Sequence, residues 1–412
     1  MNLAIASVSA LALAVAVSFT SRMNVGALAI ALAWIVGVLM GGLSFADIAL
    51  GFPSELFLML IGVTMLFTSA QANGTLDRLT HYAVRLCRGN AGLVPVMFFL
   101  LALLLASIGP GNIAIAALLA PIAMQVAGRA SIPAFLMTIM VGNGAQAGSL
   151  SPVAPTGIIV NGLLAKIGFS GLEWPIYLNT LLAHSVIAFA GYFAFGGWKL
   201  FALGYSGGAT PSERQFEFRH WITLAVIVAL ILSVIFYRVN VGMAALTGVV
   251  ILSLTGAARE DAIKLMPWGT ILMVSGVTVL IALVEKTQGM ELFSALLARI
   301  STSGTVTATV SFVTGIVSVY SSTSGVVLPA FIPTIPGLAS RIGADPLGII
   351  YSMCVGSHLV DISPLSTVGA LCIAAAAPTE DHRRLFNLLL AWGLSMSVVG
   401  ALASWLFFGL LR

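Results

Sequence analysis

Long apolar stretches separated by short charged clusters run through the whole 412-residue chain. Most are close to 20 residues long, which is about the length a helix needs to cross the hydrocarbon core of a bilayer. The pattern therefore predicts an all-α, polytopic membrane protein whose charged clusters mark the loops. The stretches cover residues 3–20, 25–42, 55–72, 92–107, 113–127, 133–165 (interrupted), 175–197, 221–237, 241–256, 268–285, 305–320, 326–339, 347–377 (interrupted) and 385–411.

Composition supports this prediction, because 59% of the residues are hydrophobic and only 8% are charged. Such a chain has too little polar surface for water, so its solvent is lipid. The apolar residues 3–19 lack a basic segment before them and a cleavage site, so we expect a retained span. Three cysteines without paired spacing predict no disulfide framework. The basic residues are scattered without interleaved aromatic residues, which argues against a nucleic-acid partner.

The second half of the chain repeats landmarks of the first half in the same order. Each landmark returns roughly 212 to 216 positions later, and this distance drifts slowly along the chain. One matched Gly or Pro means little in this composition, but the collinear set indicates a tandem duplication. The matches join Arg22–Gly26 to Arg238–Gly242, Pro53 to Pro267, Gly62 to Gly276, Pro121 to Pro333, Gly144 to Gly356, Ser151-Pro152 to Ser363-Pro364, and Gly157 to Gly369.

The positions of Lys and Arg predict how the two copies lie in the membrane. The charge pattern becomes consistent, apart from Arg299 and Arg341, if each copy has five crossings and one hairpin that re-enters on the same side. Five is odd, so the second copy must be inverted, as in many secondary transporters. Both termini then lie outside the cytoplasm. We expect repeat 1 over residues 1–200 (hairpin 92–127, broken helix 133–165), a cytoplasmic connector over 201–220, and repeat 2 over 221–412 (hairpin 305–339, broken helix 347–377), with a flat amphipathic helix near 75–88.

Helix-breaking residues inside the apolar stretches form the candidate site. They occur at two hairpin tips, residues 107–112 and 321–325, and at two breaks, residues 142–157 and 356–369. Backbone groups freed in lipid cost several kcal/mol unless they line a cavity. Helix N-termini favour anions, and freed carbonyl groups suit a hard cation such as sodium. The alternative is that these residues only kink the helices and let them pack closely.

Asp361 is the acidic residue that the pattern places well inside a span, where the first copy has Ser149. An intramembrane carboxylate is a functional candidate, either as a cation ligand or as a proton carrier. The alternative is a buried pairing with His358. His358 itself matches Gln146 and lacks companions at ligand spacing, so no metal site beyond sodium is expected. No nucleophile elbow or P-loop is present, so we expect no enzyme and no cofactor.

With these features the chain resembles the ion-transporter superfamily of the divalent-anion:sodium symporters and the large subunits of TRAP transporters, and most of all its MatC-like malonate and dicarboxylate carrier branch. Symporter tips carry Ser-Asn-Thr before a helix of small residues that ends at Pro. Counting back from Pro121 and Pro333 puts that triplet on Pro110-Gly111-Asn112 and Ser322-Thr323-Ser324, and neither matches. The resemblance also implies a homodimer that works by an elevator mechanism.

The sequence therefore predicts a secondary active transporter, coupled to sodium or to a proton, for small dicarboxylates such as malonate or C4-dicarboxylates. We expect it in the bacterial inner membrane. Rival hypotheses are a TRAP membrane subunit that needs a periplasmic binding protein, and a passive anion channel. The predicted substrate-binding residues are Pro110, Gly111, Asn112, Ser151, Thr156, Ser322, Thr323, Ser324, Ser363, Ser366 and Thr367. The predicted cation-binding residues are Ser107, Asn112, Asn143, Gly157, Ser321, Asp361 and Gly369.

Overall fold

The computed structural model describes residues 2–411 except 21–22, 77, 80–81, 83–88, 205–214, 238 and 377–379. Most of the predicted flat helix near 75–88 and half of the connector therefore lie outside the described residues. Every named element is helical. In chain order the α-helices are α1 (Leu3–Thr20), α2 (Val25–Trp34), α3 (Phe45–Ala49), α4 (Ser54–Ala72), α6 (Leu93–Ser107), α7 (Gly111–Arg129), α8 (Ala134–Ser149), α9 (Pro155–Lys166), α10 (Glu173–Ala194), α11 (Phe218–Tyr237), α12 (Val241–Leu254), α13 (Trp268–Lys286), α14 (Gly289–Arg299), α15 (Val306–Tyr320), α16 (Leu328–Phe331), α17 (Ile335–Ile342), α18 (Pro346–Leu359), α19 (Thr367–Ala375) and α20 (His382–Ser404).

Shorter helical pieces of other types extend or join these helices. The π-helical pieces are η1 (Ile35–Met40), η4 (Thr323–Val327) and η6 (Trp405–Leu410), and the 3₁₀ pieces are η2 (Gly197–Ala202), η3 (Glu260–Leu265) and η5 (Ile332–Thr334). Pro329, Pro333 and Pro336 explain why η4 to α17 is a succession of short types, since each proline removes a backbone donor and disturbs the preceding turn.

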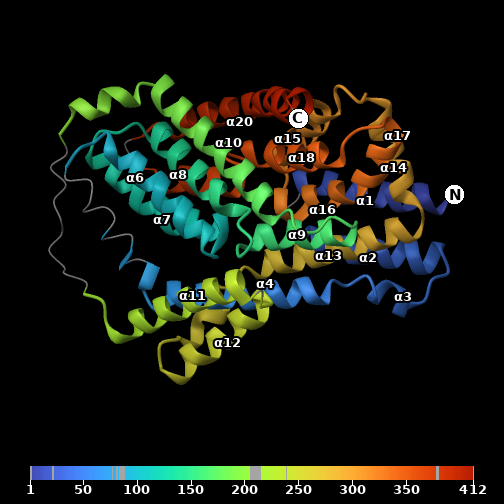
Figure 1. The fold of residues 1–412 in the computed structure, drawn as a ribbon, viewed down its shortest axis with the longest axis horizontal. Helices are drawn as coiled ribbons and strands as arrows, with labels where there is room; N and C mark the ends of the chain where they lie inside the picture. Colours follow the sequence, from blue (N-terminus) through green and yellow to red (C-terminus); the bar gives the residue numbers. More distant parts are fainter. Residues whose placement is uncertain are drawn as a thin grey trace.

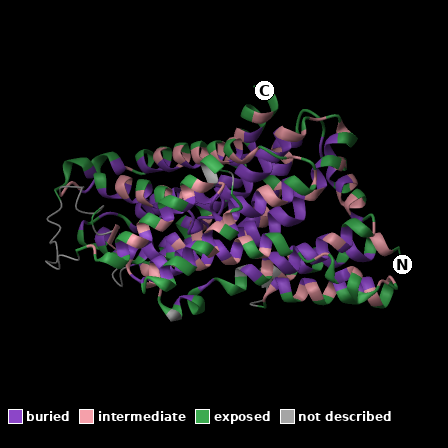
Figure 2. Ribbon diagram, turned by 60° about the horizontal axis from the view of Figure 1, so that its bottom comes forward, coloured by how far each residue is buried: buried purple, intermediate pink, exposed green. Residues whose placement is uncertain are grey.

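The helices form two groups that meet along the long axis (Figure 1). In one group α2 packs on α13 and α4 packs on α12, with α1 and α11 beside them. In the other, α8 packs between α6 and α10, and α18 packs between α15 and α20. Buried residues run through the middle of both groups, and exposed residues face outward (Figure 2). We call the first group the outer helices and the second the bundle.

Glycines let the outer helices cross at very short distances. A Cβ on Gly26 of α2 would lie 2.1 Å from the Leu272 carbonyl oxygen, and one on Gly276 would lie 2.2 Å from the Gly26 carbonyl oxygen. The crossing of α4 and α12 has the same construction, because a Cβ on Gly62 would lie 2.2 Å from the Gly242 carbonyl oxygen. Only glycine permits such backbone contact between membrane helices.

Two side-chain hydrogen bonds tie the ends of the outer helices in a matching way. Ser7 of α1 and Thr287, directly after α13, place their hydroxyl oxygens 2.6 Å apart. Asn73, directly after α4, donates to the hydroxyl of Thr223 in α11 at 2.8 Å. The two pairs therefore join corresponding helices of the two halves, with the roles of the halves exchanged.

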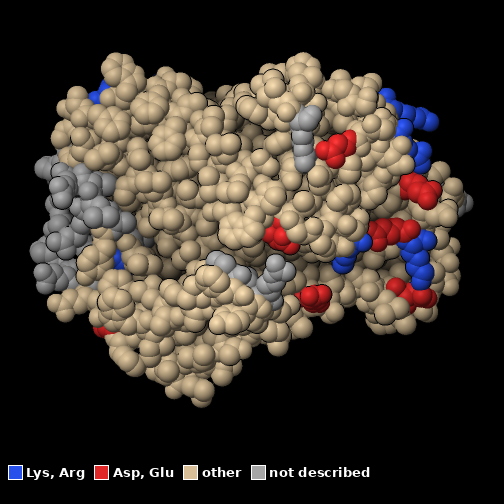
Figure 3. All heavy atoms as spheres, in the orientation of Figure 1, with Lys and Arg blue, Asp and Glu red and all other residues tan. Residues whose placement is uncertain are grey.

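Several helices have the length and composition of membrane spans. Five of the described helices pass this test, or six if the bent pair α13–α14 is one span, and further apolar helices are shorter. On the face drawn in Figure 3, Lys and Arg lie toward the two ends of the long axis. The protein is thus a multi-pass, helical membrane protein.

Each half contains two helices joined by a very short tip. In the first half α6 ends at Ser107 and α7 begins at Gly111. Gly109 at this tip has φ 142° and lies against the Phe67 ring of α4, where a side chain would not fit. In the second half α15 ends at Tyr320 and η4 begins at Thr323, and Gly325 lies against Met273 of α13. Each tip therefore meets an outer helix of its own half.

Candidate substrate site

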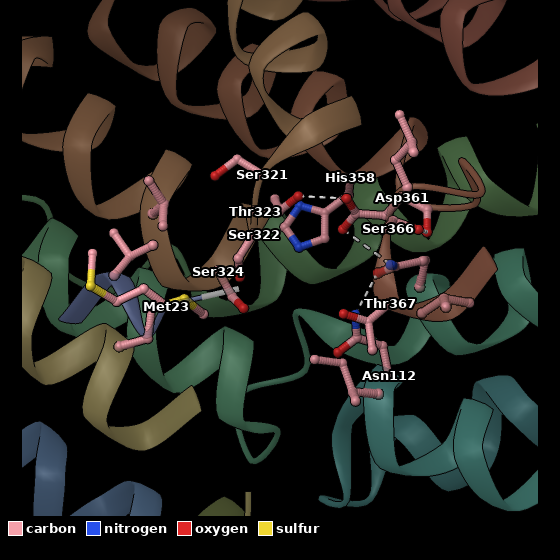
Figure 4. Close-up of a pocket in the computed structure, with 17 residues that line it drawn as sticks. Met23, Asn112, Ser321, Ser322, Thr323, Ser324, His358, Asp361, Ser366 and Thr367 are labelled. Carbon is pink, nitrogen blue, oxygen red and sulfur yellow. Dashed lines mark hydrogen bonds between the residues drawn. The ribbon is translucent and has the colours of Figure 1, made fainter. Parts of the chain in front are cut away.

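A cavity of about 290 Å³ lies where the second tip, the second break and the start of α7 come together. This volume is near the lower end for small-molecule sites, which begin at about 300 Å³. Met23, Val25 and Met273 of the outer helices close one side. Eight predicted site residues line the cavity: Asn112, Ser321, Ser322, Thr323, Ser324, Asp361, Ser366 and Thr367 (Figure 4).

Three helix N-termini point their first turns toward this cavity. The helix that starts at η4 is capped by Ser322, whose hydroxyl accepts from the Gly325 N–H at 3.1 Å. Helix α19 is capped by Ser366, which accepts from the Gly369 N–H at 3.3 Å. Helix α7 begins at Gly111 and contributes Asn112 to the lining. Free N–H groups at helix N-termini attract negative charge, so the cavity is suited to an anion.

Asp361 connects the two halves of the site through hydrogen bonds. Thr323 Oγ1 donates to Asp361 Oδ1 at 2.6 Å, and Gln146 Nε2 donates to Asp361 Oδ2 at 3.1 Å. Asn112 Nδ2 in turn donates to Gln146 Oε1 at 3.0 Å. Asp361 is 7% exposed, and among the described residues no Lys or Arg forms an ion pair with it. A buried carboxylate without a cationic partner is costly and marks a functional group.

His358 does not pair with Asp361, contrary to the structural alternative considered from the sequence. Its Nδ1 lies 2.8 Å from the carbonyl oxygen of Cys354, one turn back in α18. Its Nε2 has no hydrogen-bond partner among the described residues. The ring lines the cavity beside Thr323 and Asp361 (Figure 4).

The other predicted residues lie at the first tip and around the two breaks, outside the cavity lining. Ser151 Oγ donates to the Ser107 carbonyl oxygen at 2.6 Å, so the first tip and the first break meet directly. Gly111 lies against Pro155, and Pro110 occupies the N-cap position of α7 without a capping hydrogen bond from its side chain. Thr156 is buried in the first turn of α9. These contacts make the first half a tight support for Asn112.

The two helix breaks have the same local backbone structure. A Cβ on Gly157 would lie 2.0 Å from the Ser151 carbonyl oxygen, and one on Gly369 would lie 2.1 Å from the Ser363 carbonyl oxygen. Only glycine can follow the break so closely. In the second break, Ser366 Oγ also donates to the Asp361 and Ser363 carbonyl oxygens, which holds the turn in place.

Asn143, a predicted cation ligand, is not among the residues that line the cavity. Its Nδ2 donates to the Ile139 carbonyl oxygen, and its Oδ1 lies 2.8 Å from Nδ1 of His184 in α10. Both side chains are fully buried between helices of the bundle. Asn143 therefore joins α8 to α10 and does not face the cavity.

Sequence reasoning missed Gln146 and His358 as lining residues, together with the apolar wall from the outer helices. The two polar residues occupy matching positions in the two copies, each three residues before Ser149 or Asp361. That match between the two copies was the feature of the sequence that could have identified Gln146 and His358 as site residues. Within the described residues no group of three or more His, Cys, Asp or Glu is placed to hold a metal ion.

Comparison with known proteins agrees with this architecture. Residues 1–149 match the family model described as "Dicarboxylate carrier protein MatC N-terminus". The YdaH transporter of Alcanivorax borkumensis, a solved structure, aligns over 91% of this chain and 87% of its own with a TM-score of 0.60 and 15% sequence identity. No curated protein sequence matches the chain. The chain therefore has a transporter fold.

Proposed function

We propose that this protein is a secondary active transporter that moves small dicarboxylates by coupling them to a cation. The observation that carries the proposal is the convergence of the starts of η4, α7 and α19 on one cavity that contains a buried carboxylate. Helix N-termini can hold two carboxylates even though the described lining residues include no Arg or Lys. The family match over residues 1–149 supports dicarboxylates as the substrate class.

Charge balance supports coupling to a cation. A dicarboxylate beside an ionised Asp361 would bring three negative charges together in a buried space, and the described residues that line the cavity include no Lys or Arg. Partial charges at helix ends offset only part of this repulsion. A cation that enters with the substrate, sodium or a proton, lowers the cost. The second tip and break, which carry Ser321, Asp361 and Gly369, are where we propose that it binds.

The proposed architecture is a pair of inverted repeats. The elements recur in the same order, and the Gly26–Gly276 crossing corresponds to Gly242–Gly62 with the two halves exchanged. Such an exchange is what a two-fold axis between the repeats requires. We propose that the bundle moves against the outer helices as an elevator in a homodimer, with Met23 and Met273 at the boundary.

A transport assay separates this proposal from its rivals. The purified chain is reconstituted alone into liposomes, and labelled malonate and succinate uptake is measured together with a panel of mono- and tricarboxylates. We expect saturable uptake of dicarboxylates and faster labelled entry when unlabelled substrate is inside. Uptake that requires an added binding protein indicates a TRAP subunit, uptake without this counterflow indicates a channel, and no dicarboxylate uptake refutes the proposal.

A further inference from the structure

His358 lines the cavity, and its ring contains a buried hydrogen-bond acceptor that no described residue uses. A carbonyl oxygen only accepts, so the 2.8 Å contact with Cys354 requires a proton on Nδ1, and the lack of a described acceptor for a second proton in this buried place favours the neutral ring. Nε2 then carries a lone pair. The residue is 1% exposed, and Nε2 meets no donor among the described residues. A buried acceptor of this kind costs free energy until a donor reaches it.

The groups around His358 favour a hydrogen-bond donor on the part of the substrate that lies beside it. Both carboxylate oxygens of Asp361 already accept hydrogen bonds, from Thr323 and from Gln146. His358 and Asp361 line the same cavity (Figure 4). A substrate carboxylate, which only accepts, has no partner here, and the free N–H groups that suit it belong to the starts of η4 and α19. A hydroxyl group between the two carboxylates would donate to Nε2.

We propose that the site selects hydroxylated dicarboxylates and that His358 is the residue that recognises the hydroxyl through Nε2. The inference rests on the proposed function and narrows its substrate class. Gln146 occupies the matching position in the first copy and uses both ends of its amide within the site, so it leaves no such free acceptor. The two copies therefore differ at the position that recognises the hydroxyl group, which is His358 in the second copy and Gln146 in the first.

Competition between pairs of compounds that differ by one hydroxyl tests this assignment. Uptake of labelled succinate into liposomes that contain the full chain is inhibited by malate or succinate, and by hydroxymalonate or malonate. In the wild-type protein we expect the hydroxylated member of each pair to inhibit at an about tenfold lower concentration, because it alone satisfies the buried acceptor.

Three variants separate recognition from packing. His358→Leu should bring the ratio for each pair to about one, and His358→Gln should keep a preference because the amide oxygen accepts a hydrogen bond. His184→Leu is the matched control, since His184 is also buried and its Nε2 has no partner among the described residues, but it does not line the cavity. It should keep the wild-type ratio. Because each result is a ratio within one preparation, losses in folded protein cancel.

The possible outcomes are distinct. Equal inhibition by both members of each pair in the wild-type protein overturns the inference and leaves the proposed function intact. A His358→Leu variant that keeps the preference overturns it too. If all four compounds inhibit the His358→Leu variant more weakly than the wild-type protein and by the same factor, His358 binds a carboxylate as an imidazolium. This result also contradicts the inference. If the wild-type protein takes up no dicarboxylate, the proposed function fails and this inference fails with it.

Discussion

Replacing Thr323 by valine tests the link between the second tip and the second break. The Thr323 hydroxyl donates to Asp361 Oδ1 at 2.6 Å, and the residue is 4% exposed. Valine keeps the shape of the side chain but removes the donor, so one oxygen of a buried carboxylate loses its partner. Hydrogen bonds to charged groups contribute about 1.5–3 kcal/mol. If the bond is needed to form the site, kcat/KM for dicarboxylate uptake falls about 10- to 150-fold.

A matched control exists one helix earlier. Thr314 in α15 is also buried, but its hydroxyl donates to the Val310 carbonyl oxygen of its own helix at 2.7 Å. Thr314→Val therefore makes the same chemical change without touching the site and should leave kcat/KM near the wild-type value. Thr323→Ser keeps the donor and should retain most of the activity. Equal losses in Thr323→Val and Thr314→Val would refute the reasoning.

Three further changes test other parts of the account. Asp361→Asn should abolish the stimulation of uptake by a cation gradient while the protein stays monodisperse in detergent, because the amide carries no charge to balance; cation stimulation equal to wild type would contradict this. Gly62→Ala should lower the free energy of unfolding by about 1–3 kcal/mol in a thermal unfolding assay, since its Cβ would lie 2.2 Å from the Gly242 carbonyl oxygen. Lys286 donates to Asp47 and holds the pKa of that carboxylate below its ordinary value, so Lys286→Gln should lower the melting temperature at neutral pH; this difference should shrink as the pH falls below about 4, the ordinary pKa of an Asp carboxyl, because Asp47 then binds a proton in the unfolded chain.

The sequence indicated the helical membrane class and the places where the helices break. Breaks in lipid require residues that tolerate unusual backbone, and the Gly, Ser and Pro residues at 107–112 and 363–369 carry that information locally. The closeness of Gly157 to Ser151 and of Gly369 to Ser363 gives a physical reason for two of these glycines. Residues whose role depends only on the local backbone can be read from the sequence.

Side-chain roles that depend on distant partners could not be predicted in this way. Asn143 was a candidate cation ligand, but its partner His184 lies on another helix and draws it into the bundle. Gln146 and His358 were noticed only as a matched pair, because nothing local tells whether a polar residue of an apolar helix faces a cavity. The wall formed by Met23 and Met273 depends on how the two groups of helices meet, which no local pattern contains.

Concentrative uptake by the chain alone tests the central claim most directly. Liposomes that contain only this protein are given labelled dicarboxylate under an inward sodium gradient, an inward proton gradient, or choline with no gradient of either ion. The account predicts accumulation of substrate inside above the outside concentration under at least one of the two cation gradients, and only equilibration in choline. Equilibration without accumulation under both gradients would contradict a cation-coupled carrier.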